Sequence, residues 1–342
     1  MLKMNISKSE PFFIAEIGHN HQGDVKKAMD LIKMSKEAGA DAVKFQKRSN
    51  KKLYTKEFYN SLYDNKNSYG KTYGEHREAL EFDKKQFLEL IDFSNKIGIN
   101  LFATPFDFDS IDFLDELDLP AFKIASADLQ NTPLQVEIAK RNKTIFLSTG
   151  HGTLDDVKRA RDAICKYNKN LIIMHCCASY PAEISDLNLN VIQTYKKTFS
   201  DHIIGLSDHE NGIDAGPIAY QLGARVFEKH VTLDHSLKGT DHSFSLEPIG
   251  FTKFIRNIKR IPTMLGSSEK KILDSEKAPV YKMAKSIVAK RNILKGEKVS
   301  IENLTFKSPG GGLPPYYFYE IENKVINKDL REDEILKIEF LK

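Results

Sequence analysis

Residues 204–248 decide how the rest of the chain is interpreted, and they read IGLSDHENGIDAGPIAYQLGARVFEKHVTLDHSLKGTDHSFSLEP. Two short β-branched runs, Ile203–Leu206 and Arg225–His230, end at polar clusters that contain His209 and His230. The small-residue segment between them is long enough for a helix that crosses back over a parallel sheet. Two histidines at adjacent strand ends would face each other across a barrel mouth, and this geometry suits a metal site.

The same pattern of short apolar run, polar end and amphipathic segment repeats outward from this stretch, between residue 12 and about residue 265. The runs are almost continuously apolar, as strands buried on both faces should be. The helical patterns at Lys26–Lys36 and Lys84–Lys96 end just before Gly39 and Gly98, which are typical helix stops. Eight βα units in roughly 250 residues predict an α/β fold of the (β/α)8 TIM-barrel type, with a doubly wound sheet as the alternative. The expected strands are Phe12–Ile17, Ala42–Gln46, Leu101–Ala103, Ala121–Ala125, Thr144–Leu147, Leu171–His175, Ile203–Leu206 and Val226–His230.

The domain organisation follows from where this rhythm changes. We expect a barrel domain at residues 1–265, a polar, lysine-rich linker with a short helix at 266–285, and a small β-rich domain at 286–342. The last segment is too short to bury much apolar surface by itself, so we expect it to dock on another surface. Residues 47–82 form a long insertion between the second strand and its helix, and their tyrosines and basic residues suit a substrate cover or, alternatively, a solvated excursion.

Composition narrows the class of protein. The chain has 342 residues, 41% hydrophobic and 29% charged, and a net charge of +4 without any basic stripe, so nucleic-acid binding is not expected. No apolar run approaches the length of a membrane-spanning helix, and the N-terminus lacks the apolar core of a signal peptide. An odd count of three cysteines in a large chain favours a reducing, cytoplasmic location.

Polar side chains at the strand ends are the candidate site, because active sites of this fold lie at the carboxyl ends of the strands. Lys44 and Lys123 stand inside otherwise apolar strands, where a lone charge is costly to bury. They predict a phosphate or carboxylate cage, and the alternative is that each lysine pairs with a neighbouring acid of the barrel. The other candidates at strand ends are Glu16, Gln46, Thr104, Ser126, Asp128, Ser148, Tyr180, Ser207, His209 and His230.

His209 and His230, with Glu16 nearby, predict a divalent metal site for Mn²⁺ or Mg²⁺ acting as a Lewis acid. The alternative is that both are structural histidines of the core, with their hydrogen bonds made inside the protein. Cys176 and Cys177 form a rival set of soft ligands, but they lack the CxxC spacing of a metal site.

At these residues the chain resembles the sialic acid synthase family, the phosphoenolpyruvate-dependent nonulosonate synthases. The matching stretches occur in order along the barrel, and SIVAKRNILKGEKVSIENLTFKSPGGGLPP resembles the antifreeze-like (SAF, β-clip) domain of that family. The barrel stretches are IAEIGHNHQGD, DAVKFQ, ATPFD, FKIASAD, LSTG, HCCASYP, IGLSDH, EKHVTLD and DHSFSLEP. The insertion SYGKTYGEHREALEF looks closer to the animal-type synthases than to typical bacterial ones.

The resemblance implies condensation of phosphoenolpyruvate with an N-acylated hexose, such as N-acetylmannosamine or its 6-phosphate, to give a nine-carbon α-keto acid and phosphate. It implies that His209 and His230 hold the metal, that Glu16 transfers a proton or orients a metal-bound water, and that Gln46 and Asp128 lie near the reacting atoms. It places phosphoenolpyruvate at Lys44, Thr104, Lys123, Ser126 and Ser207, and the sugar at Ser148, Tyr180 and Asp241.

The resemblance also implies a domain-swapped homodimer, in which the small domain caps the barrel of the partner. Two departures affect the expected sugar and phosphoenolpyruvate contacts: Ala178 replaces an asparagine and Ser308 replaces an arginine of many bacterial members. The alternatives are a synthase for legionaminic acid that uses a diacetamido hexose, another phosphoenolpyruvate–aldose phosphate synthase, and a carbohydrate-binding protein with an inactive barrel.

Overall fold

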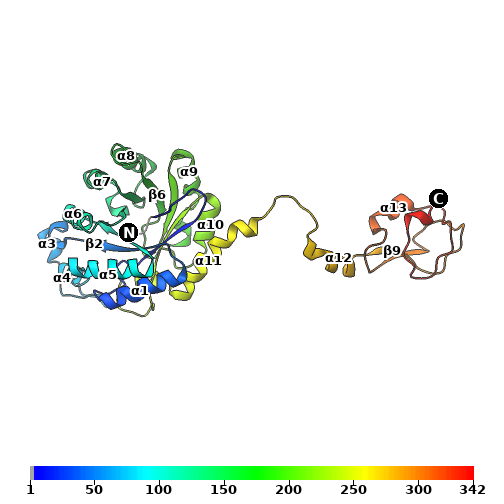
Figure 1. Ribbon diagram of the computed structural model, residues 1–342, viewed down its shortest axis with the longest axis horizontal. Coiled ribbons are helices and arrows are strands. Elements are labelled where there is room, and N and C mark those ends of the chain that lie inside the picture. Colours follow the sequence, from blue (N-terminus) through cyan, green and yellow to red (C-terminus); the bar gives the residue numbers. More distant parts are fainter. Residues whose placement is uncertain (1–3) are drawn as a thin grey trace. The chain divides into compact units, whose positions relative to one another are not determined.

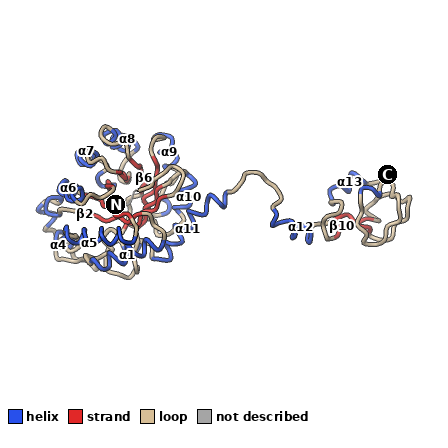
Figure 2. The backbone as a smooth tube through the Cα atoms, in the orientation of Figure 1, coloured by secondary structure: helices blue, strands red, loops and turns tan. Residues whose placement is uncertain are grey.

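The computed structural model describes residues 4–342, which form two compact units (Figures 1 and 2). The first unit extends to Met264 and the second comprises Leu265–Lys342. None of the helices in the described part of the chain is both long enough and apolar enough to cross a membrane.

The first unit is a closed barrel of eight parallel strands in sequence order, which confirms the predicted fold class. The barrel closes where β1 pairs with β8, and this pairing places Glu16 beside His230. The observed strands match the predicted runs to within a residue or two at each end. Their bounds are β1 Phe12–Glu16, β2 Ala42–Lys47, β3 Asn100–Pro105, β4 Ala121–Ile124, β5 Thr144–Ser148, β6 Leu171–Cys176, β7 Ile203–Asp208 and β8 Val226–His230.

Helices surround the strands of this unit (Figure 1). The side chain of Asp24 caps the first helix, which ends at Gly39 with a left-handed φ of 98°, so the predicted glycine stop is confirmed. Asp83 and Gln86 form a capping box at the start of the helix that ends at Gly98. The helices are α1 Val25–Ala38, α2 Asn50–Leu53, α3 Lys56–Tyr59, α4 Tyr73–Glu78, α5 Lys84–Ile97, α6 Phe108–Glu116, α7 Thr132–Ala139, α8 Leu154–Cys165, α9 Val191–Thr198, α10 Ala215–Leu222 and α11 Pro248–Leu265, with short 3₁₀ turns η1 Ser126–Asp128, η2 Ile184–Asp186 and η3 His242–Phe244.

The two-residue period of the strands separates two apolar layers. Phe13 and Ala15 face the helices and belong to the main core, whereas Phe12 and Ile14 point into the barrel with Phe102, Phe146 and other inward residues. Continuing this alternation places the side chain of Glu16 inside the barrel, above the apolar floor. The same phase applies to the inward residues of the other strands, so a polar layer forms at their carboxyl ends.

The insertion between β2 and α5 is ordered and carries α2, α3 and α4. Aromatic rings of Tyr54, Phe58, Tyr63 and Tyr73 pack against one another within it, at centroid distances of 4.6–5.6 Å. An isolated antiparallel bridge joins Leu62 to Thr72. The insertion therefore has a small core of its own, which fixes the side chains that it carries.

The second unit contains an antiparallel pair of strands, Ser286–Ala289 and Leu304–Lys307, and several isolated antiparallel bridges. Its apolar core is formed by side chains such as Ile287, Leu304 and Phe318, each at most 5% exposed. Its elements are η4 Asp274–Glu276, α12 Lys277–Met283, β9 Ser286–Ala289, β10 Leu304–Lys307, η5 Pro315–Tyr317, α13 Phe318–Ile321 and η6 Ile338–Phe340.

Candidate active site

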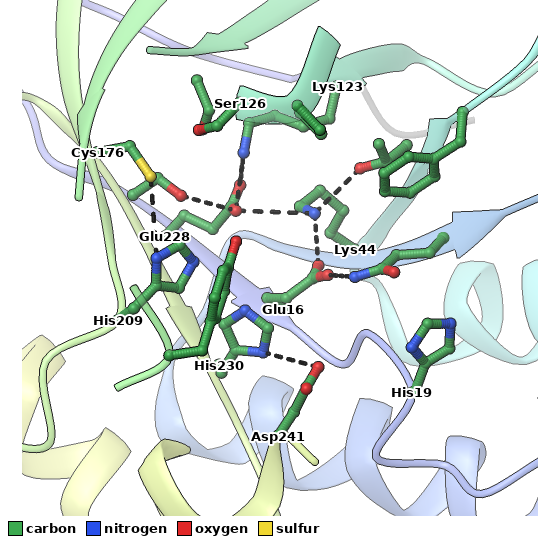
Figure 3. A pocket seen from close by; sticks show the side chains of 18 of the residues that line it. Glu16, His19, Lys44, Lys123, Ser126, Cys176, His209, Glu228, His230 and Asp241 are labelled. Atoms are coloured by element: carbon green, nitrogen blue, oxygen red, sulfur yellow. Dashed lines mark hydrogen bonds and ion pairs between the residues drawn. The ribbon is translucent and has the colours of Figure 1, made fainter. Parts of the chain in front are cut away.

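The polar layer at the carboxyl ends of the strands surrounds a cavity of about 420 Å³ (Figure 3). Most of the candidate residues from the sequence meet in it, together with several that the sequence did not single out. The lining residues are Glu16, His19, Lys44, Gln46, Arg48, Arg77, Thr104, Phe106, Lys123, Ala125, Ser126, Ala127, Ser148, His151, Cys176, Tyr180, Ser207, His209, Glu228, His230, Thr240 and Asp241.

Two buried lysines and two buried carboxylates form a connected network in this cavity (Figure 3). The Nζ atom of Lys44 lies 2.7 Å from Oε2 of Glu16 and 3.7 Å from Oε1 of Glu228. The Nζ atom of Lys123 donates to both oxygens of Glu228, at 2.8 and 2.9 Å. The lysines therefore pair with acids of the barrel, which is the alternative that the sequence left open. An incoming anion would compete with these carboxylates for the same ammonium groups.

The network shifts the pKa values of the two carboxyl groups in opposite directions. Burial opposes the ionisation of Glu228, but Lys123 and Lys44 more than offset it and lower the pKa of Glu228 to about 2. For Glu16, burial dominates over the opposing effect of Lys44, and the nearby Glu228 charge adds to it, so the pKa of Glu16 is raised. Burial likewise lowers the pKa of Lys123. A carboxyl group with a raised pKa in a cavity is suited to proton transfer.

His209 and His230 face each other at the ends of β7 and β8, with ring centroids 5.3 Å apart. Nδ1 of His209 donates to the carbonyl oxygen of Cys177 at 2.8 Å, which leaves Nε2 as the free acceptor. Nδ1 of His230 is buried without a hydrogen-bond partner, although Oδ2 of Asp241 lies 3.7 Å away. Burial lowers the pKa of His230 to about 3, so this ring is a neutral imidazole.

These donors fit a divalent metal. A backbone carbonyl that fixes the tautomer of His209 is a common outer partner of a metal-binding histidine, and the unpaired nitrogen of His230 is a second available ligand. Within residues 4–342, however, no group of three or more histidine, cysteine or acidic side chains is placed to hold a metal ion. Two imidazoles would therefore leave the other coordination positions to water or substrate.

The remaining predicted residues take distinct positions. Nε2 of Gln46 donates to Oε1 of Glu16 at 2.7 Å, and Oγ of Ser207 donates to Glu228 at 3.1 Å. The hydroxyl of Thr104 lies 3.1 Å from Nζ of Lys44, whereas the hydroxyl of Ser148 is buried without a partner.

Ser126 and Tyr180 line the same cavity from loops beyond the strands. Ser126 accepts from the backbone N–H of Gly150 at 3.0 Å, and the ring of Tyr180 packs on His209 at 4.2 Å. Asp128 is the exception. It lies at the end of η1, its carboxylate accepts from Asn131 at 2.9 Å, and it does not line the cavity. The predicted role of Asp128 near the reacting atoms is therefore not supported by any contact in the cavity.

Residues 31–270 match the model of the NeuB family, and residues 284–342 match that of the SAF domain. The chain belongs to the NeuB family. The family resemblance read from the sequence is thereby confirmed.

Relatives within the NeuB family span almost the whole chain. The chain is 38% identical to N-acetylneuraminate-9-phosphate synthase of Homo sapiens over 96% of this chain and 92% of that protein. It is also 38% identical to N,N'-diacetyllegionaminic acid synthase of Campylobacter jejuni, over 95% of this chain and 98% of that protein. Among solved structures, N-acetylneuraminic acid synthetase of Leptospira borgpetersenii, crystallised with citrate, matches with a TM-score of 0.70 at 32% identity, covering 82% of this chain and 94% of that one.

Several cavity residues of this NeuB-family chain were not predicted as site residues. Glu228 stands two positions before His230 on β8, so the strand period alone places it on the same inner face. Cys176, which the sequence offered only as a rival soft ligand, continues the inward phase of β6, and its Sγ lies 3.8 Å from Nδ1 of His209, whereas Cys177 does not line the cavity. Arg48 and Arg77 belong to the insertion, where no regular period indicates direction.

Proposed function

We propose that this chain condenses phosphoenolpyruvate with an N-acylated hexose, N-acetylmannosamine or a close analogue, to give a nine-carbon α-keto sugar acid and phosphate. One observation carries the proposal. One cavity in a NeuB-family barrel contains both the lysine–carboxylate network and the two facing imidazoles of His209 and His230. The network consists of Lys44, Lys123, Glu16 and Glu228. The product is a sialic acid or a related nonulosonic acid.

Binding of phosphoenolpyruvate, an anion, requires cationic groups and hydroxyl donors, and the lining of the cavity contains both. Lys44 and Lys123 would bind its phosphate in exchange for Glu16 and Glu228, with hydroxyls of Thr104, Ser126 and Ser207 as further donors. Ser148, Tyr180 and Asp241 line the same cavity and are the proposed contacts of the sugar.

The reaction forms one carbon–carbon bond and breaks one carbon–oxygen bond. C3 of phosphoenolpyruvate attacks the aldehyde carbon of the open-chain sugar, and the resulting alkoxide takes up a proton. Water adds to C2, and the tetrahedral adduct expels phosphate to leave the keto acid. We assign proton transfer to Glu16, because its pKa is raised by burial and Gln46 holds its carboxylate at 2.7 Å.

We propose that His209 and His230 hold the cofactor, a divalent metal such as Mn²⁺ or Mg²⁺. When bound, the ion supplies Lewis-acid stabilisation of developing negative charge on an oxygen, a contribution of several kcal/mol in such sites. The protein's own part is to present two facing imidazoles, of which that of His209 has its tautomer fixed by the carbonyl of Cys177.

We also propose a domain-swapped homodimer in a reducing, cytoplasmic environment. The cysteines at 165, 176 and 177 are all free, which fits such an environment. The SAF unit is a short segment that we expect to cap a second copy of the barrel. A monomer by light scattering would contradict this assembly.

A second candidate within the same reaction class is a legionaminic acid-type synthase that takes a diacetamido hexose. The equal identity of 38% to a human and to a Campylobacter synthase with different named products keeps this candidate open. A carbohydrate-binding protein with an inactive barrel is disfavoured, because a barrel without chemistry has no need of four buried charges.

The test is a substrate panel read by phosphate release. Phosphate should appear only when phosphoenolpyruvate, an N-acylated hexose and a divalent metal are all present. Arabinose 5-phosphate and erythrose 4-phosphate should not replace the hexose. Phosphate release with those aldoses alone would assign the chain to another phosphoenolpyruvate–aldose synthase.

A further inference from the structure

The loop between β8 and α11, residues 231–247, carries Asp241, which is the proposed contact of the sugar. An isolated bridge closes the base of this loop. Its tip includes Lys238 and Gly239, which directly precede the cavity residues Thr240 and Asp241. Gly239 has a left-handed φ of 151°, a conformation that favours glycine. How the tip is held therefore decides where the carboxylate of Asp241 points.

Two residues of the insertion bind this tip. The hydroxyl of Tyr69 donates to the carbonyl oxygen of Lys238, and the backbone N–H of Gly239 donates to Oδ1 of Asn67 at 3.3 Å. The ammonium group of Lys238 also lies 4.8 Å from the centre of the Tyr69 ring, within the range of a cation–π contact. Gln22 is a third partner, since its Nε2 donates to the same carbonyl at 2.6 Å. We call Asn67 and Tyr69 the loop clamp.

The loop clamp is itself fixed by the insertion. The backbone N–H of Tyr69 donates to Nδ1 of His76 at 3.1 Å, and this histidine of α4 is only 3% exposed. The backbone N–H of Asn67 donates to Oδ1 of Asn65 at 2.9 Å, which closes a local turn. The clamp joins residues that are 169 and 172 positions apart in the chain. Each clamp residue is therefore tied both to its own segment and to the distant loop of Asp241.

The carboxylate of Asp241 lies beside the proposed metal ligand His230 (Figure 3). Its Oδ2 is 3.7 Å from Nδ1 of His230, and its side chain is 18% exposed. Its Oδ1 accepts from the hydroxyl of Thr240 at 2.7 Å. The carboxylate thus has one oxygen tied to the loop and the other directed toward His230. A shift of the tip by about 1 Å would move this carboxylate away from a bound sugar, and misplacement of that size is costly in an active site.

Neither clamp residue lines the cavity, so any effect of the clamp on the reaction must pass through the loop. We infer that Asn67 and Tyr69 are positioning residues, which hold the tip of the β8–α11 loop so that Asp241 faces the sugar. The inference rests on the function proposed above, in which Asp241 contacts the sugar, and it gives the insertion a role in sugar affinity. The proposed phosphoenolpyruvate contacts Lys44 and Lys123 stand on β2 and β4, so the clamp should act on the sugar alone.

The test is Tyr69→Phe, which removes the donor to Lys238 and keeps the ring beside the ammonium group. The sugar is N-acetylmannosamine or its 6-phosphate, whichever wild type converts faster. Its KM should rise by about 2- to 10-fold, the effect of one lost hydrogen bond, while kcat and the KM for phosphoenolpyruvate stay within about 2-fold of wild type. Asn67→Ala should behave in the same way. Tyr59→Phe is the matched control: it removes a hydroxyl bond to Glu78 at 3.3 Å in the same insertion and should leave both KM values unchanged.

A double-mutant cycle with Asp241→Ala separates positioning from a general structural role. In the Asp241→Ala background, Tyr69→Phe should change kcat/KM for the sugar by less than about 2-fold, because no carboxylate remains to be positioned. Without any substrate, Tyr69→Phe should speed hydrogen exchange at the amide of Gly239, which the clamp binds. The melting temperature of Tyr69→Phe should stay close to that of wild type, which separates a moved loop from a lost fold.

The inference is wrong if Tyr69→Phe leaves the KM for the sugar unchanged, or if it raises the KM for phosphoenolpyruvate equally. It is also wrong if the separate effects of Tyr69→Phe and Asp241→Ala on kcat/KM multiply in the double variant, because Tyr69 would then act by another route. In both cases turnover by wild type still supports the proposed function. If wild type converts no N-acylated hexose, the proposed function fails and the inference fails with it.

Discussion

Both carboxylate oxygens of Glu228 accept hydrogen bonds from the ammonium group of Lys123, at 2.8 and 2.9 Å, although the two residues are 105 positions apart in the chain. Lys44 lies 3.7 Å from the same carboxylate and 2.7 Å from Glu16, so the four groups form one buried quartet. Removal of one acid leaves two lysines to share the other. This balance makes the quartet sensitive to substitution and responsive to a ligand anion.

Glu228→Gln should destabilise the barrel by about 3–5 kcal/mol, because it leaves a buried ammonium without its partner. Urea unfolding followed by circular dichroism measures this change. Phosphoenolpyruvate should raise the melting temperature of the variant by more than it raises that of wild type, because a phosphate can replace the lost carboxylate.

Glu37→Gln is the matched control, since the Lys33–Glu37 pair spans 3.9 Å with side chains that are 65% and 67% exposed. Its stability should change by less than about 0.5 kcal/mol. A Glu228→Gln variant as stable as this control would show that the quartet is not a buried network in solution.

Local sequence patterns were sufficient for much of this architecture. The short apolar runs, the place of Lys44 inside one of them, and the places of His209 and His230 at the ends of two others follow from a few residues each. The barrel then brings these groups together. The pairing of Lys123 with Glu228 could not be read in this way, because it depends on how the closed barrel places β4 against β8. Arg48 and Arg77 were missed for a related reason: they belong to an insertion whose short helices are set by packing among its own aromatic rings.

Asp128 differs from the other candidates in where its side chain lies. It follows β4 closely in sequence, which suggests a place in the cavity, but η1 turns its carboxylate toward Asn131. A 3₁₀ turn has three residues per turn, so the two-residue alternation of β4 does not continue into residues 126–128.

His209→Ala should abolish measurable turnover and weaken binding of Mn²⁺ by at least about 10- to 100-fold, because one of two imidazole ligands is lost. Electron paramagnetic resonance of free Mn²⁺ measures binding without any substrate. His235→Gln, which changes an exposed histidine outside the cavity, is the control and should bind the ion as wild type does. Undiminished Mn²⁺ binding by His209→Ala would refute the assignment of the metal site.

Glu16→Gln should lower kcat by about 100- to 10,000-fold, the range expected for loss of a positioned proton-transfer group. Binding of phosphoenolpyruvate, followed by calorimetry, should be at least as tight as in wild type, because the carboxylate that competes for Lys44 has been removed. Glu16→Asp should recover part of the turnover. Full activity of Glu16→Gln would instead assign the proton transfer to another group.

The stability of the barrel should fall in mild acid, and His21 isolates one cause. Its ring is 2% exposed and stacks on Phe82 at 4.2 Å, and burial lowers its pKa from the usual 6.5 to about 3. The unfolded chain therefore binds a proton at this residue more readily than the folded chain does. The contribution of His21 to the free energy of unfolding is present above pH 6.5 and is lost as the pH falls toward 3. At pH 5 the loss from this one residue is about 2 kcal/mol. His21→Asn keeps an acceptor for the N–H of Gly23 and should reduce the loss between pH 8 and pH 5 by that amount in urea unfolding, about 2 kcal/mol. An unchanged dependence on pH in His21→Asn would show that the folded state binds this proton as readily as the unfolded chain does.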